Sequence, residues 1–328
     1  MRHEPAWLRD YLIAGVEDPR LNLQSILARH FLLLALTGDA WASTMAAECR
    51  FSAAMNWLVS FVNRSAETEE LAAVLHALRR KADNAEGIEI PQFMVQTFDE
   101  LQTKPTTPEA PNYIESFLSG TTFADGKAHL YEPSLQTFQQ LWSKALSDHQ
   151  FAHSIPQLTV IEPACGSAND YRFLQAHGLA RFLDYTGFDL CATNIDNARA
   201  LFPQTRFEVG NVFEISAQDK AFDFCLVHDL FEHLSIPAME VAVREVCRVT
   251  RRGLCVGFFQ MDEIHEHIVR PMDDYHWNLL GAAPMKKLFV ENGFQAQVIH
   301  IGAFLQRQFG CDHTHNENAY TFYLRASP

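Results

Sequence analysis

From residue 158 onward, short apolar runs alternate with segments whose apolar positions follow helical spacing, and this alternation constrains the fold more than any other feature. Strands that alternate with helices are typical of a mostly parallel sheet covered on both faces. The sequence therefore predicts an α/β fold with a seven-stranded, mostly parallel sheet and helices on both faces. The predicted strands span residues 158–162, 182–188, 206–209, 222–227, 254–259, 294–301 and 320–324, and the helices 171–177, 193–201, 238–249 and 285–292. We expect the last two strands, joined without an obvious helix, to form an antiparallel pair at the edge.

The first third of the chain follows a different pattern. Apolar side chains recur at three- and four-residue intervals over residues 5–101, which predicts an all-helical domain. Residues 103–111, TKPTTPEAP, hold three prolines that disfavour helix and central strand. We therefore divide the chain into a helical domain (1–104), a linker with a bridging helix at 134–146 (105–150), and an α/β domain (151–328).

Charge and composition exclude several classes of partner. The net charge of -14 disfavours nucleic acid and anionic lipid as partners. The longest apolar block, residues 31–36, is too short to cross a bilayer, and the N-terminus lacks the pattern of a secretory signal. The 7 cysteines are odd in number and show no Cys-x-x-Cys spacing, which fits a reducing, cytoplasmic setting.

Polar and small residues follow the first three predicted strands. The first strand leads into EPACGSAND, in which the acidic Glu162 precedes a turn of small residues and then a helix. Such a turn lets a backbone approach a ligand, and the helix N-terminus directs free amide groups to the same place. Asp189 follows the second strand and could accept hydrogen bonds from a ribose, while residues 210–213, GNVF, follow the third and could contact an adenine. Three strand ends thus carry chemistry suited to one adenosine.

With these motifs, residues 130–328 resemble the class I S-adenosylmethionine-dependent methyltransferases, in particular the group that acts on small molecules. Residues 162–168 are similar to the family's first motif, although Ala164 and Ala168 stand where glycines are commoner, and HDLFEHL (228–234) resembles the segment after the fourth strand. The resemblance implies a Rossmann-like fold and S-adenosylmethionine as cofactor. The implied cofactor-binding residues are Tyr131, Glu162, Ala164, Cys165, Gly166, Asp170, Asp189, Leu190, Asn211, Val212, Phe213 and His228.

This resemblance implies methyl transfer to O, N or C of a small-molecule metabolite, for example in natural-product biosynthesis. The helical domain would supply part of the acceptor pocket, a lid or a homodimer interface. A non-catalytic S-adenosylmethionine-binding module remains an alternative. A dinucleotide oxidoreductase would require Gly-x-Gly-x-x-Gly, which the turn lacks, and Asp170 would repel a pyrophosphate.

An acceptor with an acidic proton needs a base, and the candidates are His228, His265 and His276. His233, within the EHL tripeptide, is expected to be structural or a wall of the acceptor pocket. No metal is predicted, but a metal-assisted reaction on an acidic acceptor is a second alternative. Its ligands would be His228 and Asp229 with one of His265, His267 or His276, a two-histidine, one-carboxylate set.

Overall fold

The structure, a computed structural model, describes part of the chain. The described residues are 17–38, 41–42, 45–46, 48–49, 51–53, 55–56, 122–124, 127–129, 132–148, 157–309, 314 and 316–327. The chain divides into two compact units. One, here called the sheet unit, comprises Leu27–Leu33, Trp142–Ile301 and Asn318–Pro328. The domain boundaries predicted near residues 104 and 150 lie outside the described residues and stay predictions.

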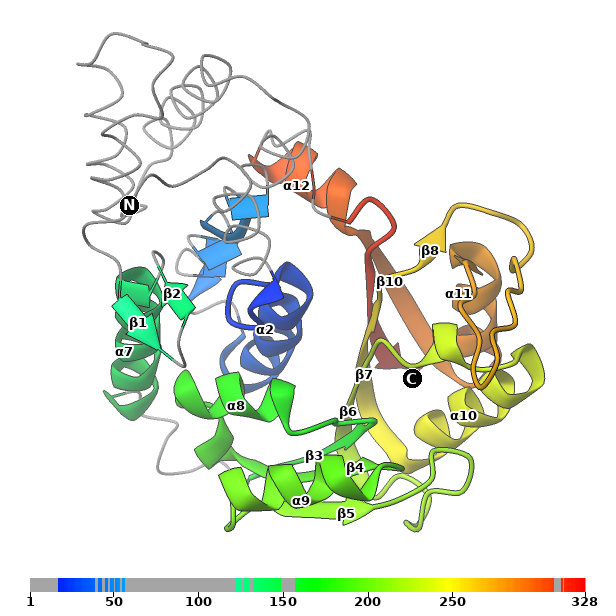
Figure 1. Cartoon of the computed structure of the whole chain (residues 1–328), viewed down its shortest axis with the longest axis horizontal. Helices are drawn as coiled ribbons and strands as arrows, with labels where there is room; N and C mark the ends of the chain where they lie inside the picture. Colours follow the sequence, from blue (N-terminus) through cyan, green and yellow to red (C-terminus); the bar gives the residue numbers. More distant parts are fainter. Residues whose placement is uncertain are drawn as a thin grey trace, which may run out of the picture. The chain divides into compact units, whose positions relative to one another are not determined.

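A seven-stranded sheet forms the centre of the sheet unit, in the order β10-β11-β7-β6-β3-β4-β5 (Figure 1). Its strands are β3 (Leu158–Pro163), β4 (Leu183–Asp189), β5 (Arg206–Val209), β6 (Phe222–His228), β7 (Thr250–Phe258), β10 (Phe294–His300) and β11 (Tyr320–Ala326). The strands from β7 to β5 pair in parallel, whereas β11 is antiparallel to both β7 and β10. The predicted mostly parallel sheet is confirmed, and so is the antiparallel pair at its edge.

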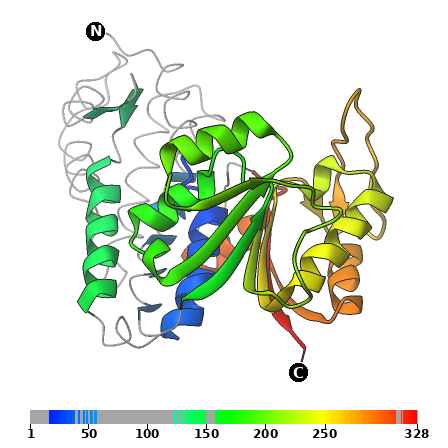
Figure 2. The same cartoon turned by 90° about the horizontal axis from the view of Figure 1, so that it is seen from below.

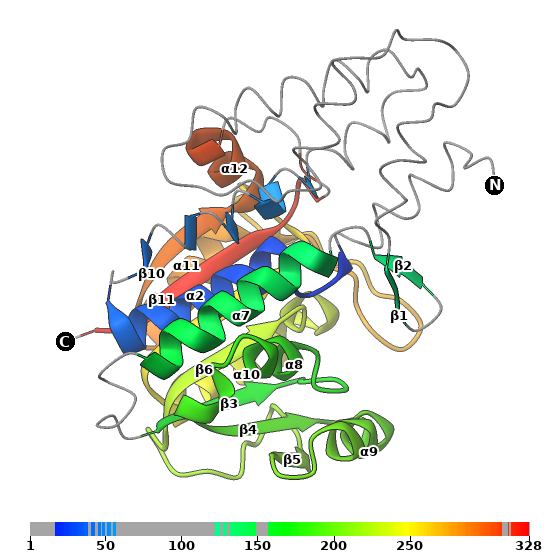
Figure 3. The same cartoon turned by 90° about the vertical axis from the view of Figure 1, so that its left-hand side faces the viewer.

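Four helices cover the two faces of this sheet. They are α8 (Asn169–Ala176), α9 (Ala192–Leu201), α10 (Ile236–Val249) and α11 (Ala282–Glu291). The chain moves one way along the sheet from β3 to β5 and the other way from β6 to β7, so right-handed crossovers place α8 and α9 opposite α10 and α11. Figures 1 and 2 show this layering, with the green helices α8 and α9 on one side of the strands and the yellow and orange helices α10 and α11 on the other. Figure 3 views the sheet from the side that carries α8. Helices on both faces, as predicted, are confirmed.

Successive side chains of β6 point to opposite faces, and this alternation decides which residues meet α8. Cys225 and Val227 join the fully buried apolar core with residues of α10 and α11. Phe224 points the other way and meets Phe31 of α2 (Leu23–Thr37), with ring centroids 5.5 Å apart. His228 is four residues after Phe224 on the same strand, so its side chain points to the same face as Phe224, which is the face that carries α8.

Other elements match the sequence less closely. The bridging helix is present as α7 (Glu132–Asp148), but the helix α12 (Ile301–Phe309) lies between β10 and β11, where we predicted none. The prediction was wrong because α12 begins directly after β10, inside the run read as strand, so no turn residue marked the change. The remaining short elements are β1 (Thr122–Ala124), β2 (Lys127–His129), β8 (Met261–Asp262), β9 (Leu280–Gly281), and the 3-10 turns η2 (Ala180–Phe182) and η3 (Phe231–His233). None of the helices in the described residues is long and apolar enough to span a membrane.

Gly253 in β7 is required by the close approach of its neighbours. A Cβ atom there would lie 2.6 Å from the backbone oxygen of Leu324 and 3.0 Å from the Phe31 ring. We expect Gly253→Ala to lower the free energy of unfolding by roughly 1–3 kcal/mol, because a backbone carbonyl must move. Urea unfolding followed by circular dichroism measures this loss. Val290→Ala, at a side chain that is 51% exposed, is the control and should change little. Equal midpoints for Gly253→Ala and wild type would contradict the packing described.

Candidate functional site

The order of the strands creates a switch point between β3 and β6. The chain leaves β3 toward β5 and then returns to β6, which pairs with β3 on its other side. In such sheets, ligands bind at the carboxyl ends of the strands beside this point. Glu162, Asp189 and His228 lie at the carboxyl ends of β3, β4 and β6. The structure thus brings together three residues that the sequence predicted for one site.

The turn after β3 has an unusual backbone. Ala164, Gly166 and Ala168 have φ values of 56°, 54° and 66°, in the left-handed region. Only glycine adopts this region freely, so the two alanines need the surrounding structure to hold them. A hydrogen bond of 3.1 Å from the amide of Cys165 to the Phe188 carbonyl ties the turn to β4. This turn is the predicted first motif, and α8 begins directly after it.

Asp189 joins this turn to the start of α9. Its Oδ2 accepts a hydrogen bond of 3.0 Å from the Gly166 amide, and its Oδ1 accepts one of 2.8 Å from the Cys191 amide. Asn194 Nδ2 donates a third, longer hydrogen bond of 3.4 Å to Oδ1. A carboxylate has about four lone-pair sites, so one site stays open to a hydroxyl group of a ribose. Leu190, next along the chain, is 74% exposed and offers an apolar surface beside the carboxylate.

A buried acidic cluster lies under the turn. Glu162 is 3% exposed, and its Oε2 accepts a hydrogen bond of 2.5 Å from the Tyr185 hydroxyl. Burial and then the neighbouring Asp170 carboxylate raise the pKa of Glu162 well above its usual value, although the Tyr185 bond opposes them. Cys165 is also buried, and burial raises the pKa of its thiol far above the usual range. Neither Glu162 nor Cys165 is therefore suited to act as a charged nucleophile.

Asp170 and His228 form a largely buried pair between α8 and β6. A short hydrogen bond joins His228 Nδ1 and Asp170 Oδ2. The side chain of His228 is 14% exposed and that of Asp170 is 11% exposed. Burial alone would lower the pKa of His228, but the Asp170 carboxylate raises it well above the usual value. The other ring nitrogen, Nε2, is buried without a hydrogen-bond partner. This geometry favours an ion pair that fixes α8 to β6 over a role for His228 as a base.

The other predicted histidines lie in the segment after β7. His265 is exposed and forms no side-chain hydrogen bond within the described part of the chain. His276 is partly buried, and its carbonyl accepts a hydrogen bond of 3.2 Å from Nδ1 of His233. His267 Nδ1 accepts a hydrogen bond of 3.0 Å from the Gly281 amide. Among the described residues, no group of three or more His, Cys, Asp or Glu side chains could hold a metal ion, so the metal-assisted alternative lacks its ligand set. Tyr131 lies outside the described residues.

Asn211, Val212 and Phe213, predicted to contact adenine, follow β5 in a tight turn. Asn211 Oδ1 accepts a hydrogen bond of 2.9 Å from the Phe213 amide, so its side chain shapes the backbone of this turn. Phe213 is 37% exposed, whereas Val212 packs partly against the core. The loop therefore presents an aromatic surface on a backbone held from within.

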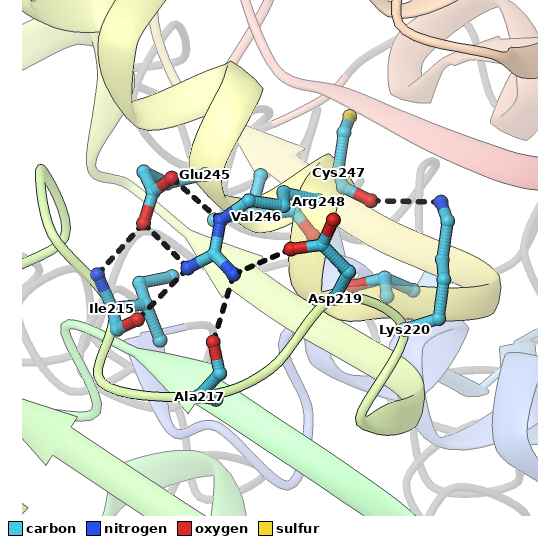
Figure 4. A network of polar contacts seen from close by, with 9 residues as sticks. Ile215, Ala217, Asp219, Lys220, Glu245, Val246, Cys247 and Arg248 are labelled. Carbon is cyan, nitrogen blue, oxygen red and sulfur yellow. Dashed lines mark hydrogen bonds and ion pairs between the residues drawn. The ribbon is translucent and has the colours of Figure 1, made fainter.

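Two residues of α10 clamp this loop from outside (Figure 4). Glu245 Oε2 accepts a hydrogen bond of 2.8 Å from the Ile215 amide, and Arg248 donates 2.9 Å and 2.8 Å bonds to the carbonyls of Ile215 and Ala217. Arg248 also forms ion pairs with Glu245 and Asp219 at 2.8 Å and 2.9 Å. An open hollow of about 630 Å³ lies beside this clamp. Our sequence analysis missed both residues, since an acid and an arginine three positions apart on a helix also occur as surface pairs.

A hairpin arm, residues 268–279, follows β8. It is closed by bridges between Ile268 and Leu279 and between Pro271 and His276. Asn278, fully buried, anchors it by donating 3.0 Å and 2.8 Å hydrogen bonds to the Glu232 and Leu234 carbonyls. The arm is therefore fixed to the turn η3 that follows β6.

Glu232 fixes the end of β7 to the same turn. Its carboxyl group is fully buried and accepts a hydrogen bond of 2.8 Å from the Phe259 amide. Burial, together with the nearby Asp229 carboxylate, raises the pKa of Glu232 to about 8. A carboxyl group with this pKa is mostly protonated at neutral pH, so it can stay buried without a charged partner.

Comparison with known proteins gives a family match over part of the chain. Residues 161–256 match the family model described as methyltransferase domain. No match was found among curated proteins. Similar solved structures include a SAM-dependent methyltransferase from Methanosarcina mazei (14% identity, 55% of this chain and 98% of that chain, TM-score 0.41). They also include the PH0226 protein from Pyrococcus horikoshii (16%, 66% and 99%, TM-score 0.40). A third is 1,6-didemethyltoxoflavin-N1-methyltransferase from Burkholderia thailandensis, with 1,6-didemethyltoxoflavin and S-adenosylhomocysteine bound (12%, 74% and 93%, TM-score 0.41).

The clamp gives a prediction about the loop. Arg248→Ala removes the donors to two loop carbonyls, so we expect the Ile215 amide to exchange with deuterium about tenfold faster, a change of about 1.4 kcal/mol in local opening. Hydrogen exchange measured by mass spectrometry on residues 211–219 tests this. Arg244→Ala, at an exposed arginine on the same helix, is the matched control. An unchanged loop in Arg248→Ala would show that the clamp does not restrain it.

His267 gives a prediction about pH. Its Nδ1 accepts a hydrogen bond from an amide, so only the unprotonated ring forms it, and burial lowers the pKa of His267 below the usual value. The unfolded chain then binds a proton more readily than the folded one, and stability falls as pH drops below about 6.5. His267→Asn keeps an acceptor but does not titrate, so its free energy of unfolding should depend less on pH between about 7 and 5. His265→Asn is the control. Identical pH profiles for His267→Asn and wild type would contradict the assigned bond.

Proposed function

We propose that this chain carries a class I S-adenosylmethionine-dependent methyltransferase domain, which includes residues 161–256, and that the protein transfers a methyl group from this cofactor to a small molecule. The observation that carries the proposal is the position of Asp189. It lies at the carboxyl end of β4, next to the switch point, and bonds to the left-handed turn after β3. A carboxylate held in this way can accept hydrogen bonds from a ribose without having to move first.

The described residues fit the cofactor part by part. Leu190 and Phe213 are exposed apolar side chains that follow β4 and β5, and we assign them to the two sides of the adenine. The side chains of the turn at 164–168 are small. The ribose and the methionine part of the cofactor can therefore come close to the backbone of this turn. Asn211 is committed to the Phe213 amide through its oxygen, which leaves its NH₂ group free to donate. We assign Tyr131 the same cofactor-binding role that the sequence predicted.

The cofactor supplies an electrophilic methyl group on a sulfonium, which is transferred by in-line displacement. The protein has to position the acceptor, exclude water and remove a proton where the acceptor is acidic. Glu162 and the Asp170–His228 pair do none of this directly. They hold the turn, α8 and β6 in fixed positions beneath the cofactor, and we class them as positioning residues.

The acceptor in this proposal is a small metabolite. The net charge of -14 opposes binding of nucleic acid. The described cysteines are all free, in keeping with the proposed reducing, cytoplasmic setting. A homodimer formed through the N-terminal helices and a role in natural-product biosynthesis remain part of the proposal.

Isothermal titration calorimetry with S-adenosylhomocysteine tests the proposal, with NAD as the control ligand. We expect binding of S-adenosylhomocysteine and no binding of NAD, because the turn after β3 lacks the pyrophosphate motif. Binding of NAD alone would overturn the proposal in favour of an oxidoreductase. Cofactor binding without release of S-adenosylhomocysteine from S-adenosylmethionine, across a panel of phenolic, amine and carbon-acid acceptors, would favour the non-catalytic module.

Asp189→Ala should weaken binding of S-adenosylhomocysteine by roughly 2 kcal/mol, or about 30-fold, through loss of charge-assisted hydrogen bonds. Asp196→Ala is the matched control, because this acid on α9 is 76% exposed. Circular dichroism checks that each variant is folded. Unaltered affinity in Asp189→Ala would remove the ribose assignment.

A further inference from the structure

Four aromatic rings gather where β6 and β7 end. His233 in η3 contacts the rings of Phe259, Tyr275 and Trp277, with centroids 5.4, 5.7 and 5.4 Å away. Phe259 and Trp277 also contact each other at 5.0 Å. We call these four residues the ring cluster. It lies at the carboxyl end of the sheet, as the cofactor-binding residues do, because both parallel strands end there.

The ring cluster is not a closed core. Tyr275 and Trp277 are 45% and 37% exposed, and His233 and Phe259 are partly buried. Large aromatic side chains are usually buried further, and an exposed group of them marks a surface that binds something. The rings meet at tilted and edge-on angles, which are the geometries that aromatic groups prefer when they pack together.

The histidine in the cluster is held in one tautomer. Its Nδ1 lies 3.2 Å from the His276 carbonyl, which can only accept, so Nδ1 carries a proton. In the neutral ring, Nε2 then holds the lone pair. Unlike Nε2 of His228, Nε2 of His233 is not buried, and within the described residues it has no hydrogen-bond partner. An imidazole fixed through one nitrogen with the other free is the usual arrangement of a general base.

We propose that the ring cluster binds a flat aromatic acceptor that carries an O–H or N–H group, and that His233 takes the proton of this group. The O–H or N–H bond of the acceptor breaks, an N–H bond forms at Nε2, and the electron pair left on the acceptor becomes free to attack. The proposal rests on the proposed methyl transfer. The sequence predicted a structural role for His233 or a place in the wall of the acceptor pocket, whereas this proposal makes His233 the base.

The test uses 2-naphthol as probe, and its saturated counterpart 2-decalol as the control, on the full chain with and without S-adenosylhomocysteine. We expect 2-naphthol to bind at least about tenfold more tightly than 2-decalol, because only the flat ring stacks. Trp277→Ala should remove most of this difference. Met272→Ala is the matched control, since Met272 is 49% exposed on the same hairpin arm but lies outside the ring cluster. Equal binding of the two alcohols would overturn the aromatic acceptor.

Absorbance of the bound 2-naphthol reports whether its proton is removed. We expect a larger ionised fraction in the complex with wild type than in water at the same pH, and a loss of this increase in His233→Gln. Glutamine keeps a donor for the His276 carbonyl, so the Kd of 2-naphthol should change by less than about threefold. An ionised fraction that is the same in His233→Gln and wild type would overturn the role of His233. Failure of the proposed function would instead appear as absent binding of S-adenosylhomocysteine.

Discussion

The hydrogen bond between the Gly166 amide and the Asp189 carboxylate is the interaction on which the site depends. It connects the turn after β3 to the end of β4. The same carboxylate also accepts a hydrogen bond from the amide of Cys191, which directly precedes α9. Because every residue of β3 is paired with a residue of the parallel strand β4, the carboxyl ends of the two strands lie side by side in a fixed register. The Asp189 side chain therefore fixes two loops and still has one acceptor site to offer a ligand.

Two other sets of side chains fix the loops on either side of Asp189. On the side of the proposed cofactor site, Arg248 and Glu245 hold the loop that presents Phe213. On the side of the proposed acceptor site, Asn278 and Glu232 hold the hairpin arm and the end of β7 against η3. In each case a buried or half-buried polar side chain bonds to main-chain groups, so loops without regular structure are fixed by a helix or a strand end. Loops held in this way can present binding groups in constant positions.

The sequence predicts the sheet and the residues at its strand ends, but not the contacts of the histidines. The strand ends were found because buried parallel strands are apolar runs, and Glu162 and Asp189 are polar residues that end them. The roles of the histidines could not be found, because they depend on contacts between distant residues. His228 differs from a free histidine only through Asp170, which is 58 positions away. His233 is oriented by the His276 carbonyl, 43 positions away, and a backbone carbonyl leaves no trace in a sequence. The helix α12 was missed since its first residue also continues the apolar run of β10.

The antiparallel strand β11 has a consequence for how the protein is made. β10 joins the sheet only through β11, which is synthesised after it, and the hydroxyl of Tyr323 in β11 donates a hydrogen bond to the Leu27 carbonyl, 296 positions earlier. Contacts between such distant positions form slowly, because the loop that they close costs entropy. During synthesis, β7 and β10 therefore expose unpaired backbone until β11 emerges. In this interval the open edge of β7 can pair with a wrong strand, although the central strands are already complete.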